Sequence, residues 1–361
     1  MTLRRWLTLA LLACLLPIAS QRAWAQPSFD FDRNPGNLPK SVVPTHYALW
    51  LDLDPARSTF SGQVDIAIEV RQSVAAIVLH ARDLSPTRSV LVHGDKAQGE
   101  HILLPGPGPI SQSWALRTLD GADIPPGRYQ LKIAYTGDVN RSAVGLFAAG
   151  ETHRMLATQF EAIAARNVFP SFDEPAFRAV FQISVRAPPG LKVFSNMPKS
   201  AMLADGDAVL HHFAPTPAMP SYLVAVSVGR FETLSGSAAG VPLRILTAPG
   251  KKAQADYAMR VTQQVLPFYT AYFGLPFALP KLDQQAVPSV RDGAMEARAG
   301  LLPAAAGRFT DPARAVQLIQ DQQRLAGDDG ALPARRVAAQ IALLAAVRQR
   351  EAAPLQNLLA R

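Results

Sequence analysis

The stretch HYALWLDLD, residues 46–54, decides the architecture of this chain because its apolar side chains stand at alternate positions. The stretch GQVDIAIEV, residues 62–70, repeats that alternation. A period of two is that of a β-strand with one buried and one solvated face. The pairs Asp54-Pro55 and Ser61-Gly62 are typical of turns. We therefore expect half-buried antiparallel strands joined by turns over residues 42–92.

The same alternation continues far along the chain. It recurs in GRYQLKIAYTG (127–137), AVFQISVRAP (179–188) and SYLVAVSVGRFE (221–232), without helical windows between them. Thirty prolines and twenty-three glycines, widely spread, punctuate many short segments. We expect a mainly β chain whose N-terminal domain, residues 36–238, is a saddle-like β-sandwich. An ordinary β-sandwich interaction module would show the same pattern.

The pattern changes after Gly240. Residues 241–250, VPLRILTAPG, have the pattern of one more strand, and residues 255–274 carry apolar side chains at helical spacing, with Gly274 as a C-cap. We expect a truncated α/β segment over residues 239–300. An Ala, Leu, Arg and Gln mixture with Asp-Pro and Leu-Pro helix starts predicts a short helical tail over residues 301–361.

The N-terminus has the layout of a secretory signal peptide over residues 1–25. Arg4 and Arg5 precede an apolar run over residues 6–18, and small residues lead to a cleavage point after Ala25. We expect an exported protein, periplasmic or extracellular, with no integral membrane span once the signal is removed. Lipid attachment at Cys14 is the alternative, and it fits less well because the apolar run continues past that cysteine.

Charge and composition exclude one class of partner. The formal net charge is +8, but lysine and arginine are scattered, with no basic run and no interleaved aromatic residues. We therefore expect no binding of nucleic acid. The chain has 361 residues, of which 48% are hydrophobic. A chain of this length and composition can bury a sizeable core.

Four segments carry a resemblance to a known family. They are LPKSVVPTHYALWLDLD (38–54), ATQFEAIAARNVFPSFDEPAFRAVFQISV (157–185), SNMP (195–198) and YFGLPFALPKLDQQAVPSVRDGAMEA (272–297). In this order they resemble the N-terminal domain and the entry into the catalytic domain of the zinc aminopeptidases of the aminopeptidase N family. The last segment ends in the first four letters of the family's G-A-M-E-N motif.

The resemblance implies a site for the free N-terminus of a peptide. Two carboxylates that converge on an ammonium group hold it by charge-assisted hydrogen bonds. By resemblance these are Glu161 and Glu296, and Gln159 adds an amide oxygen.

The same motif implies contacts along the rest of the peptide. The backbone of Gly293 and Ala294 would run beside it as an additional strand, and Met295 would form part of the wall of the pocket for its first residue.

The nearby sequence FDEP contains two adjacent carboxylates, Asp173 and Glu174, that we interpret as structural. A proline follows them, which favours turn formation with Asp173 accepting from backbone amides over an acid–base couple. Arg166 is expected to be an ion-pair partner for one of them.

The chain departs from the family where catalysis is concerned. The family binds zinc through H-E-x-x-H downstream of G-A-M-E-N, and here the last histidine is His212. Ala297 replaces the asparagine of the motif. We therefore expect no catalytic residues, no metal ligands and no cofactor in this chain, although the family uses zinc.

The seven histidines of the chain do not suggest a zinc site of another kind. They are widely spaced, and His211 and His212 would point to opposite faces of a strand.

Three hypotheses follow for function. The first is an exported protein that retains the elements for anchoring peptide N-termini and is non-catalytic alone. The second is an aminopeptidase that becomes active with a separately supplied catalytic chain carrying H-E-x-x-H. The third is a β-sandwich interaction module, whose uncovered apolar second-domain face drives oligomerisation or aggregation.

Overall fold

The computed structural model describes residues 30–94, 99–288, 294–297 and 300–303. The described residues from Asn37 onward belong to one compact unit, and those up to Gly36 belong to another. Among the residues described, no helix has the length and apolar character needed to cross a membrane.

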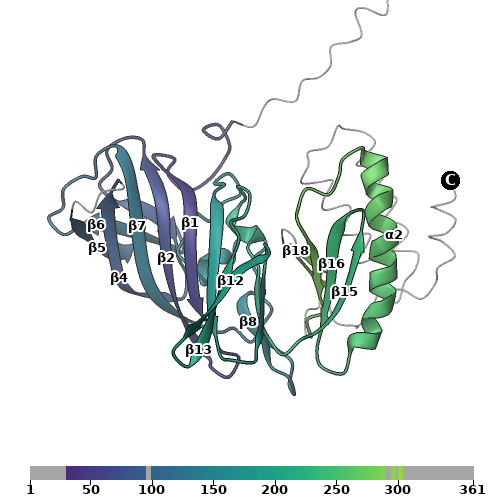
Figure 1. Ribbon diagram of the computed structural model, residues 1–361. Helices are drawn as coiled ribbons and strands as arrows, with labels where there is room; N and C mark the ends of the chain where they lie inside the picture. Colours follow the sequence, from purple (N-terminus) through teal and green to yellow (C-terminus); the bar gives the residue numbers. More distant parts are fainter. Residues whose placement is uncertain (1–29, 95–98, 289–293, 298–299, 304–361) are drawn as a thin grey trace, which may run out of the picture. The chain divides into compact units, whose positions relative to one another are not determined.

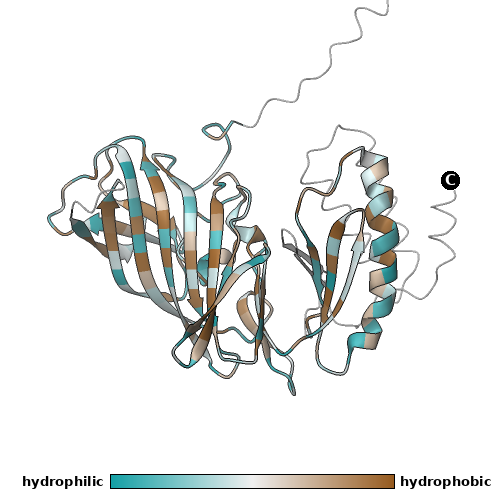
Figure 2. Ribbon diagram, in the orientation of Figure 1, coloured by the Kyte–Doolittle hydropathy of each residue, from teal (hydrophilic) through white to brown (hydrophobic). Residues whose placement is uncertain are grey.

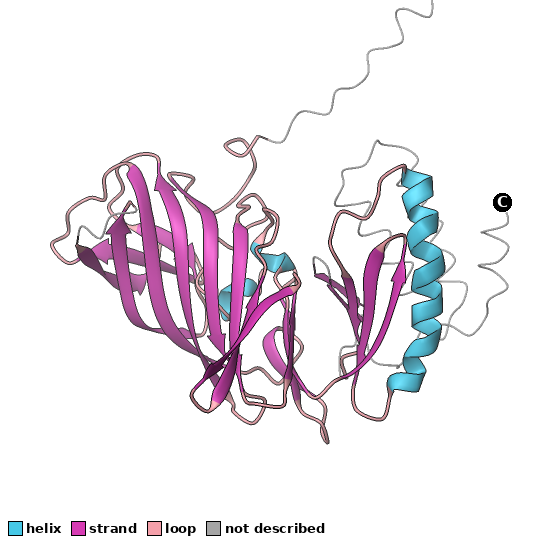
Figure 3. Cartoon of the chain, viewed as in Figure 1, coloured by secondary structure: helices cyan, strands magenta, loops and turns pink. Residues whose placement is uncertain are grey.

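A ten-stranded sheet forms the bulk of the molecule (Figures 1 and 3). In spatial order its strands are β12 (Lys199–Asp205), β13 (Ala208–Phe213), β10 (Val180–Ala187), β1 (Val42–Asp52), β2 (Thr59–Val70), β7 (Gly127–Asp138), β4 (Leu84–His93), β5 (Glu100–Pro107), β6 (Ser113–Thr118) and β3 (Ile77–His80). The pairing is antiparallel except between β1 and β10, which are parallel. The parallel pair involves β10, which lies outside the antiparallel strands expected over residues 42–92 and reaches β1 from more than a hundred residues along the chain.

Two smaller sheets complete the described fold. The four-stranded sheet has the order β11 (Lys192–Ser195), β14 (Val226–Gly229), β9 (Met155–Gln159) and β8 (Gly145–Ala149). The five-stranded sheet has the order β15 (Glu232–Ala238), β16 (Val241–Thr247), β17 (Leu282–Gln285), β19 (Gly300–Pro303) and β18 (Ala294–Ala297). The helical elements are η1 (Ala165–Asn167), η2 (Ser221–Leu223), η3 (Lys252–Ala255) and α2 (Asp256–Phe273).

The apolar residues of the alternating strands form the core, as expected from the sequence. Hydrophobic and hydrophilic residues alternate along β1, β2 and β7 (Figure 2), and the hydrophobic ones are buried. Tyr47 stacks on Phe181 of the neighbouring strand with ring centroids 4.6 Å apart, and its hydroxyl accepts the backbone N–H of Phe172. The mainly β prediction is confirmed.

One predicted turn is wrong. Ser61 and Gly62 lie inside β2, where Gly62 pairs with Tyr135 of β7. A Cβ at Gly62 would stand 2.6 Å from the ring of Tyr135, so the glycine makes room for an aromatic ring on the neighbouring strand. The predicted single strand over residues 221–232 is also divided, into η2, β14 and the start of β15, because the chain passes there from one sheet to another.

The elements after residue 240 follow the sequence closely. β16 is the expected strand, and α2 ends at Gly274, whose φ of 63° is the left-handed conformation of a glycine C-cap. The predicted helical tail over residues 301–361 lies outside the described residues, apart from 301–303, which belong to strand β19.

Two buried histidines lack hydrogen-bond partners for ring nitrogens. His211 is 2% exposed and neither of its nitrogens has a partner among the described residues, and Nδ1 of His80 has none either. Burial lowers the pKa of both imidazoles to about 4, aided by the positive charge of Lys199 near His211 and of Arg166 near His80. Both rings are therefore neutral in the folded chain at pH 7.

We predict that Gly62→Ala destabilises the β domain by about 1–3 kcal/mol, because the new methyl group would overlap a buried tyrosine ring. Chemical denaturation of the purified chain measures this change. Gly106→Ala is the matched control, since its Cβ would meet nothing closer than 3.8 Å. Equal stability of the two variants would show that Tyr135 does not constrain β2.

We predict that the free energy of unfolding falls as the pH is lowered from about 6.5 towards 4. The unfolded chain binds protons at the ordinary histidine pKa, whereas folded His80 and His211 bind them only near pH 4, so each histidine contributes a slope of up to about 1.4 kcal/mol per pH unit. Denaturation of His211→Leu at several pH values should show a shallower slope than that of the unmodified chain. The exposed His153→Leu serves as control, and a slope unchanged in His211→Leu would contradict the assignment.

Candidate functional site

The segment that carries Glu161 leaves the end of β9 in a tight turn. Phe160 is buried and its carbonyl accepts the N–H of Ala164 at 2.8 Å, while Glu161 between them is exposed. The peptide bond between Glu161 and Ala162 is cis. The side-chain oxygen of Gln159 accepts the backbone N–H of Glu161 at 3.0 Å. The structure therefore brings Gln159 and Glu161 together and presents the glutamate to solvent.

A buried polar network fixes the chain just beyond this turn. In η1 the guanidinium of Arg166 donates from Nε to Oδ2 of Asp173 at 2.9 Å and from a terminal nitrogen to the carbonyl of Asp173 at 2.9 Å. The other carboxylate oxygen of Asp173 accepts from the hydroxyl of Ser221, in η2, at 2.5 Å. The side chains of Arg166 and Asp173 are 7% and 1% exposed. The predicted ion pair of Arg166 is confirmed, and Asp173 also accepts the backbone N–H of Arg166.

The other FDEP carboxylate has a structural role as well. Oε1 of Glu174 accepts the backbone N–H groups of Asn37 and Leu38 at 2.8 and 2.9 Å. Glu174 thus holds the start of the compact unit, in agreement with its interpretation as a structural residue.

The G-A-M-E segment forms an edge of the five-stranded sheet. Ala294, Met295 and Glu296 lie in β18, which pairs antiparallel with β19, and β19 is parallel to β17. Cα atoms of β18 approach those of η2 to within 8 Å. Gly293 lies outside the described residues. The backbone that carries Glu296 therefore runs beside the same short helix that Asp173 holds.

A second set of buried contacts joins the five-stranded sheet to the β domain. Nζ of Lys281 donates to the carbonyl of Ser195 at 2.8 Å and to Asp283 at 2.6 Å, and Arg244 pairs with the same carboxylate. Burial lowers the pKa of Lys281, and the charge of Asp283 opposes that shift. An apolar cluster reinforces the contact, with members from β8, β9 and β16 (Phe147, Ala149, Met155, Ala157, Phe231, Leu246 and Val287).

The described residues do not fit a zinc ion. No group of three or more histidine, cysteine, aspartate or glutamate side chains in the described ranges is placed to hold a metal. His211 and His212 point to opposite faces of β13, as expected. The first is buried, and Nδ1 of the second lies 2.8 Å from the hydroxyl of Ser184.

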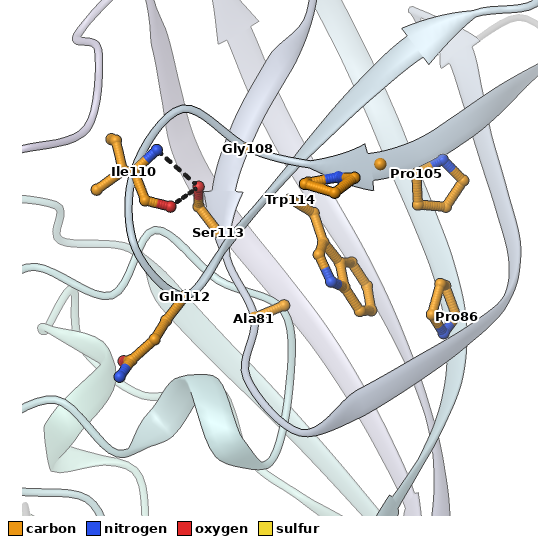
Figure 4. Close-up of a pocket in the computed structure, with 10 residues that line it drawn as sticks. Ala81, Pro86, Pro105, Gly108, Ile110, Gln112, Ser113 and Trp114 are labelled. Atoms are coloured by element: carbon orange, nitrogen blue, oxygen red, sulfur yellow. Dashed lines mark hydrogen bonds between the residues drawn. The ribbon is translucent and has the colours of Figure 1, made fainter.

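One pocket of about 470 Å³ lies elsewhere on the β domain (Figure 4). Its lining has no titratable side chain, and the hydroxyl of Ser113 is occupied by the backbone of Ile110 as both donor and acceptor. Prolines and one indole dominate the wall (Ala81, Pro86, Pro105, Gly106, Pro107, Gly108, Ile110, Gln112, Ser113 and Trp114). This pocket offers no acid, base or nucleophile.

The fold and these segments together define the class of protein. Residues 43–223 match the family model described as the Peptidase M1 N-terminal domain, a range that contains Gln159 and Glu161. The chain is 35% identical over 305 residues to aminopeptidase N of Acetobacter pasteurianus, covering 81% of this chain and 82% of that protein. This chain belongs to the aminopeptidase N family of zinc peptidases.

Longer relatives match as well. Endoplasmic reticulum aminopeptidase 1 of Homo sapiens is 34% identical over 314 residues, which are 80% of this chain and 32% of that protein. Aminopeptidase M1-C of rice, Oryza sativa subsp. japonica, is 34% identical over 275 residues, which are 74% of this chain and 31% of that protein. The chain thus spans about a third of the length of these two relatives.

Sequence reasoning missed two structural features of the site. Ser221 lies 48 residues from its partner Asp173, and no local pattern signals that contact. Lys281, directly before β17, and Asp283, inside it, did carry a signal, because side chains two residues apart in an extended chain lie on one face.

We predict that Asp173→Asn destabilises the folded chain by about 3–5 kcal/mol, because it leaves the buried guanidinium of Arg166 without its counter-charge. Thermal or chemical denaturation measures the loss. The exposed pair of Arg88 and Glu100 provides the control, and Glu100→Gln should change stability by less than about 1 kcal/mol. Similar effects of the two substitutions would contradict a supporting role for Asp173.

Proposed function

We propose that this chain binds the free N-terminus of a peptide through Glu161 and Glu296, with Gln159 as an additional acceptor. The observation that supports this best is the placement of Glu161. It is exposed at the end of a sheet strand, and the segment beyond it is tied through buried Asp173 to η2, beside which β18 runs.

The chemistry of these groups suits an ammonium ion. Two carboxylates supply opposite charge and hydrogen-bond acceptors, and the amide oxygen of Gln159 keeps a second lone pair beyond the one that accepts from Glu161. Gly293 and Ala294 would contribute main-chain hydrogen bonds to the peptide, and Met295 would border its first side chain.

We propose further that the chain does not hydrolyse peptides by itself. Its 361 residues contain no H-E-x-x-H and no histidine after His212, so neither the zinc ligands nor the general base of the family is present after the G-A-M-E segment. Residues 36–238 would act as the family's N-terminal domain and 239–300 as the start of a catalytic-like domain.

A second candidate is an aminopeptidase completed by another polypeptide. The human and rice relatives are about three times as long as the region that they share with this chain, and the resemblance implies that the zinc ligands of the family lie beyond that region. The added chain would have to supply the zinc ligands and the base, while this chain would orient the substrate amine. Zinc content and turnover of amino-acid amides, measured with and without such a segment, separate the two candidates.

We predict that the purified chain binds a short peptide with a free N-terminus and does not bind the N-acetylated form of that peptide. Removing one carboxylate, in Glu161→Gln or Glu296→Gln, should weaken binding by about tenfold, because one charge-assisted contact is lost. Calorimetric or fluorescence titration measures the affinity. Glu69→Gln, an exposed glutamate of β2, is the matched control. Equal affinity for the free and acetylated peptides would refute amine recognition.

We also predict export with cleavage after Ala25, on the basis of the signal-like residues 1–25. Intact mass measurement of the protein produced in a bacterial host should give an N-terminus at Gln26. Retention of the first 25 residues, or a lipid mass on Cys14, would contradict this prediction.

A further inference from the structure

The pocket shown in Figure 4 has rigid walls. The loop that closes it is tied together, because the N–H of Gly108 donates to the carbonyl of Ser113 at 2.9 Å and the Ser113 hydroxyl bonds both backbone groups of Ile110. A Cβ on Gly108 would overlap that hydroxyl. Three further lining residues are prolines, whose rings fix φ (Pro86, Pro105 and Pro107). The pocket is therefore preformed, and a ligand need not pay for ordering its wall.

One side of the pocket is fixed to the buried ion pair of Arg166. Gln112 has a φ of 59°, a conformation that residues other than glycine rarely adopt. Its carbonyl accepts the N–H of Ala81 at 2.9 Å, and its side-chain oxygen lies 3.4 Å from a terminal nitrogen of Arg166. These contacts hold Gln112 in place two residues before Trp114, the largest side chain in the wall.

The wall carries no formal charge. Its polar side-chain groups are the indole N–H of Trp114, the amide of Gln112 and the hydroxyl of Ser113, which is already bonded to Ile110. A charged ligand would lose hydration in this pocket without gaining a counter-charge. The wall therefore favours a neutral ligand.

The shape of the wall favours a flat ring. Figure 4 shows the indole of Trp114, which is half-buried, directed into the space between Ala81 and Pro86. In grooves that recognise proline-rich peptides, the protein supplies aromatic rings and the peptide supplies the prolines. Here the protein supplies three prolines, so the complementary guest is an aromatic ring that packs on the pyrrolidine rings and on the indole. A volume of about 470 Å³ lies in the range of about 300–1,000 Å³ typical of small-molecule sites.

We propose that this pocket binds a neutral ligand with a flat aromatic ring, of the size of a phenyl or indole group, packed against Trp114 and the prolines. The ring belongs either to a small aromatic compound or to an aromatic side chain within a peptide. The site is separate from the proposed amine site, because Gln159, Glu161 and Glu296 are not among its lining residues.

Calorimetric titration of the full chain with indole tests binding of the ring, and saturable one-to-one binding is expected. Two controls test the chemistry of the wall. Indoleacetate is charged and N-acetylprolinamide is not aromatic, so each should bind at least about tenfold more weakly than indole. The blocked peptide N-acetyl-Ala-Trp-Ala-amide distinguishes the two sources of the ring. Tighter binding than that of indole assigns the ring to a peptide, and weaker binding assigns it to a small compound.

A substitution tests the position of the ring. Trp114→Leu keeps an apolar wall but removes the flat face, so it should weaken indole binding at least about tenfold. Trp50→Leu is the matched control, since Trp50 is a half-buried tryptophan of β1 that does not line the pocket. Circular dichroism establishes that both variants are folded.

Photolabelling locates the ring in the unmodified chain. Illumination of phenyl(trifluoromethyl)diazirine, a neutral aromatic probe, releases dinitrogen, and the carbene that remains inserts into a neighbouring C–H, N–H or O–H bond. Peptide mapping should find the main label within residues 81–114, and excess indole should suppress it. No binding of indole, equal affinity for N-acetylprolinamide, equal affinity of the two tryptophan variants, or a main label outside residues 81–114 would overturn the proposal.

Discussion

The buried carboxylate of Asp173 is the constraint on which the candidate site depends. It accepts from Arg166 on one side and from Ser221 on the other, and so joins η1, just beyond the Glu161 turn, to η2, beside β18. A carboxylate that is only 1% exposed is stable in the fold only when its hydrogen bonds are satisfied. The positions of these short elements relative to one another are therefore tightly constrained. In the proposed function, the FDEP sequence would therefore support peptide binding by positioning these elements, without contact with the peptide.

The five-stranded sheet is joined to the β domain by a buried ion pair together with apolar packing. Lys281, directly before β17, donates to the carbonyl of Ser195 as a buried, paired charge, while the apolar cluster around Met155 and Leu246 excludes water from the same contact. Together the polar and apolar contacts fix β17, and through β19 they fix the register of β18. The proposed amine site would need such rigidity, because two carboxylates would have to meet one charge.

The sequence predicted the elements whose signal is local. Alternation identified β1, β2 and β7, and the cap at Gly274 marked the end of α2. The proximity of Arg166 to the FDEP carboxylates predicted an ion pair with one of them, and the structure shows that this one is Asp173. Gly62 was misassigned because a glycine beneath an aromatic ring and a glycine in a turn look alike until the neighbouring strand is known. The parallel pairing of β1 with β10 and the contact of Ser221 with Asp173 depend on long-range closure, which a single sequence does not encode in any short window. The roles of Glu161 and Glu296 rest on family resemblance, and their convergence stays a prediction.

The most direct test of that convergence is a double-mutant cycle on binding of a peptide with a free N-terminus, using Glu161→Gln, Glu296→Gln and the pair. If both carboxylates hold one ammonium group, the losses should be non-additive, with a coupling energy above about 0.5 kcal/mol. Strict additivity, or binding unaffected by either substitution, would contradict a shared amine site in this chain.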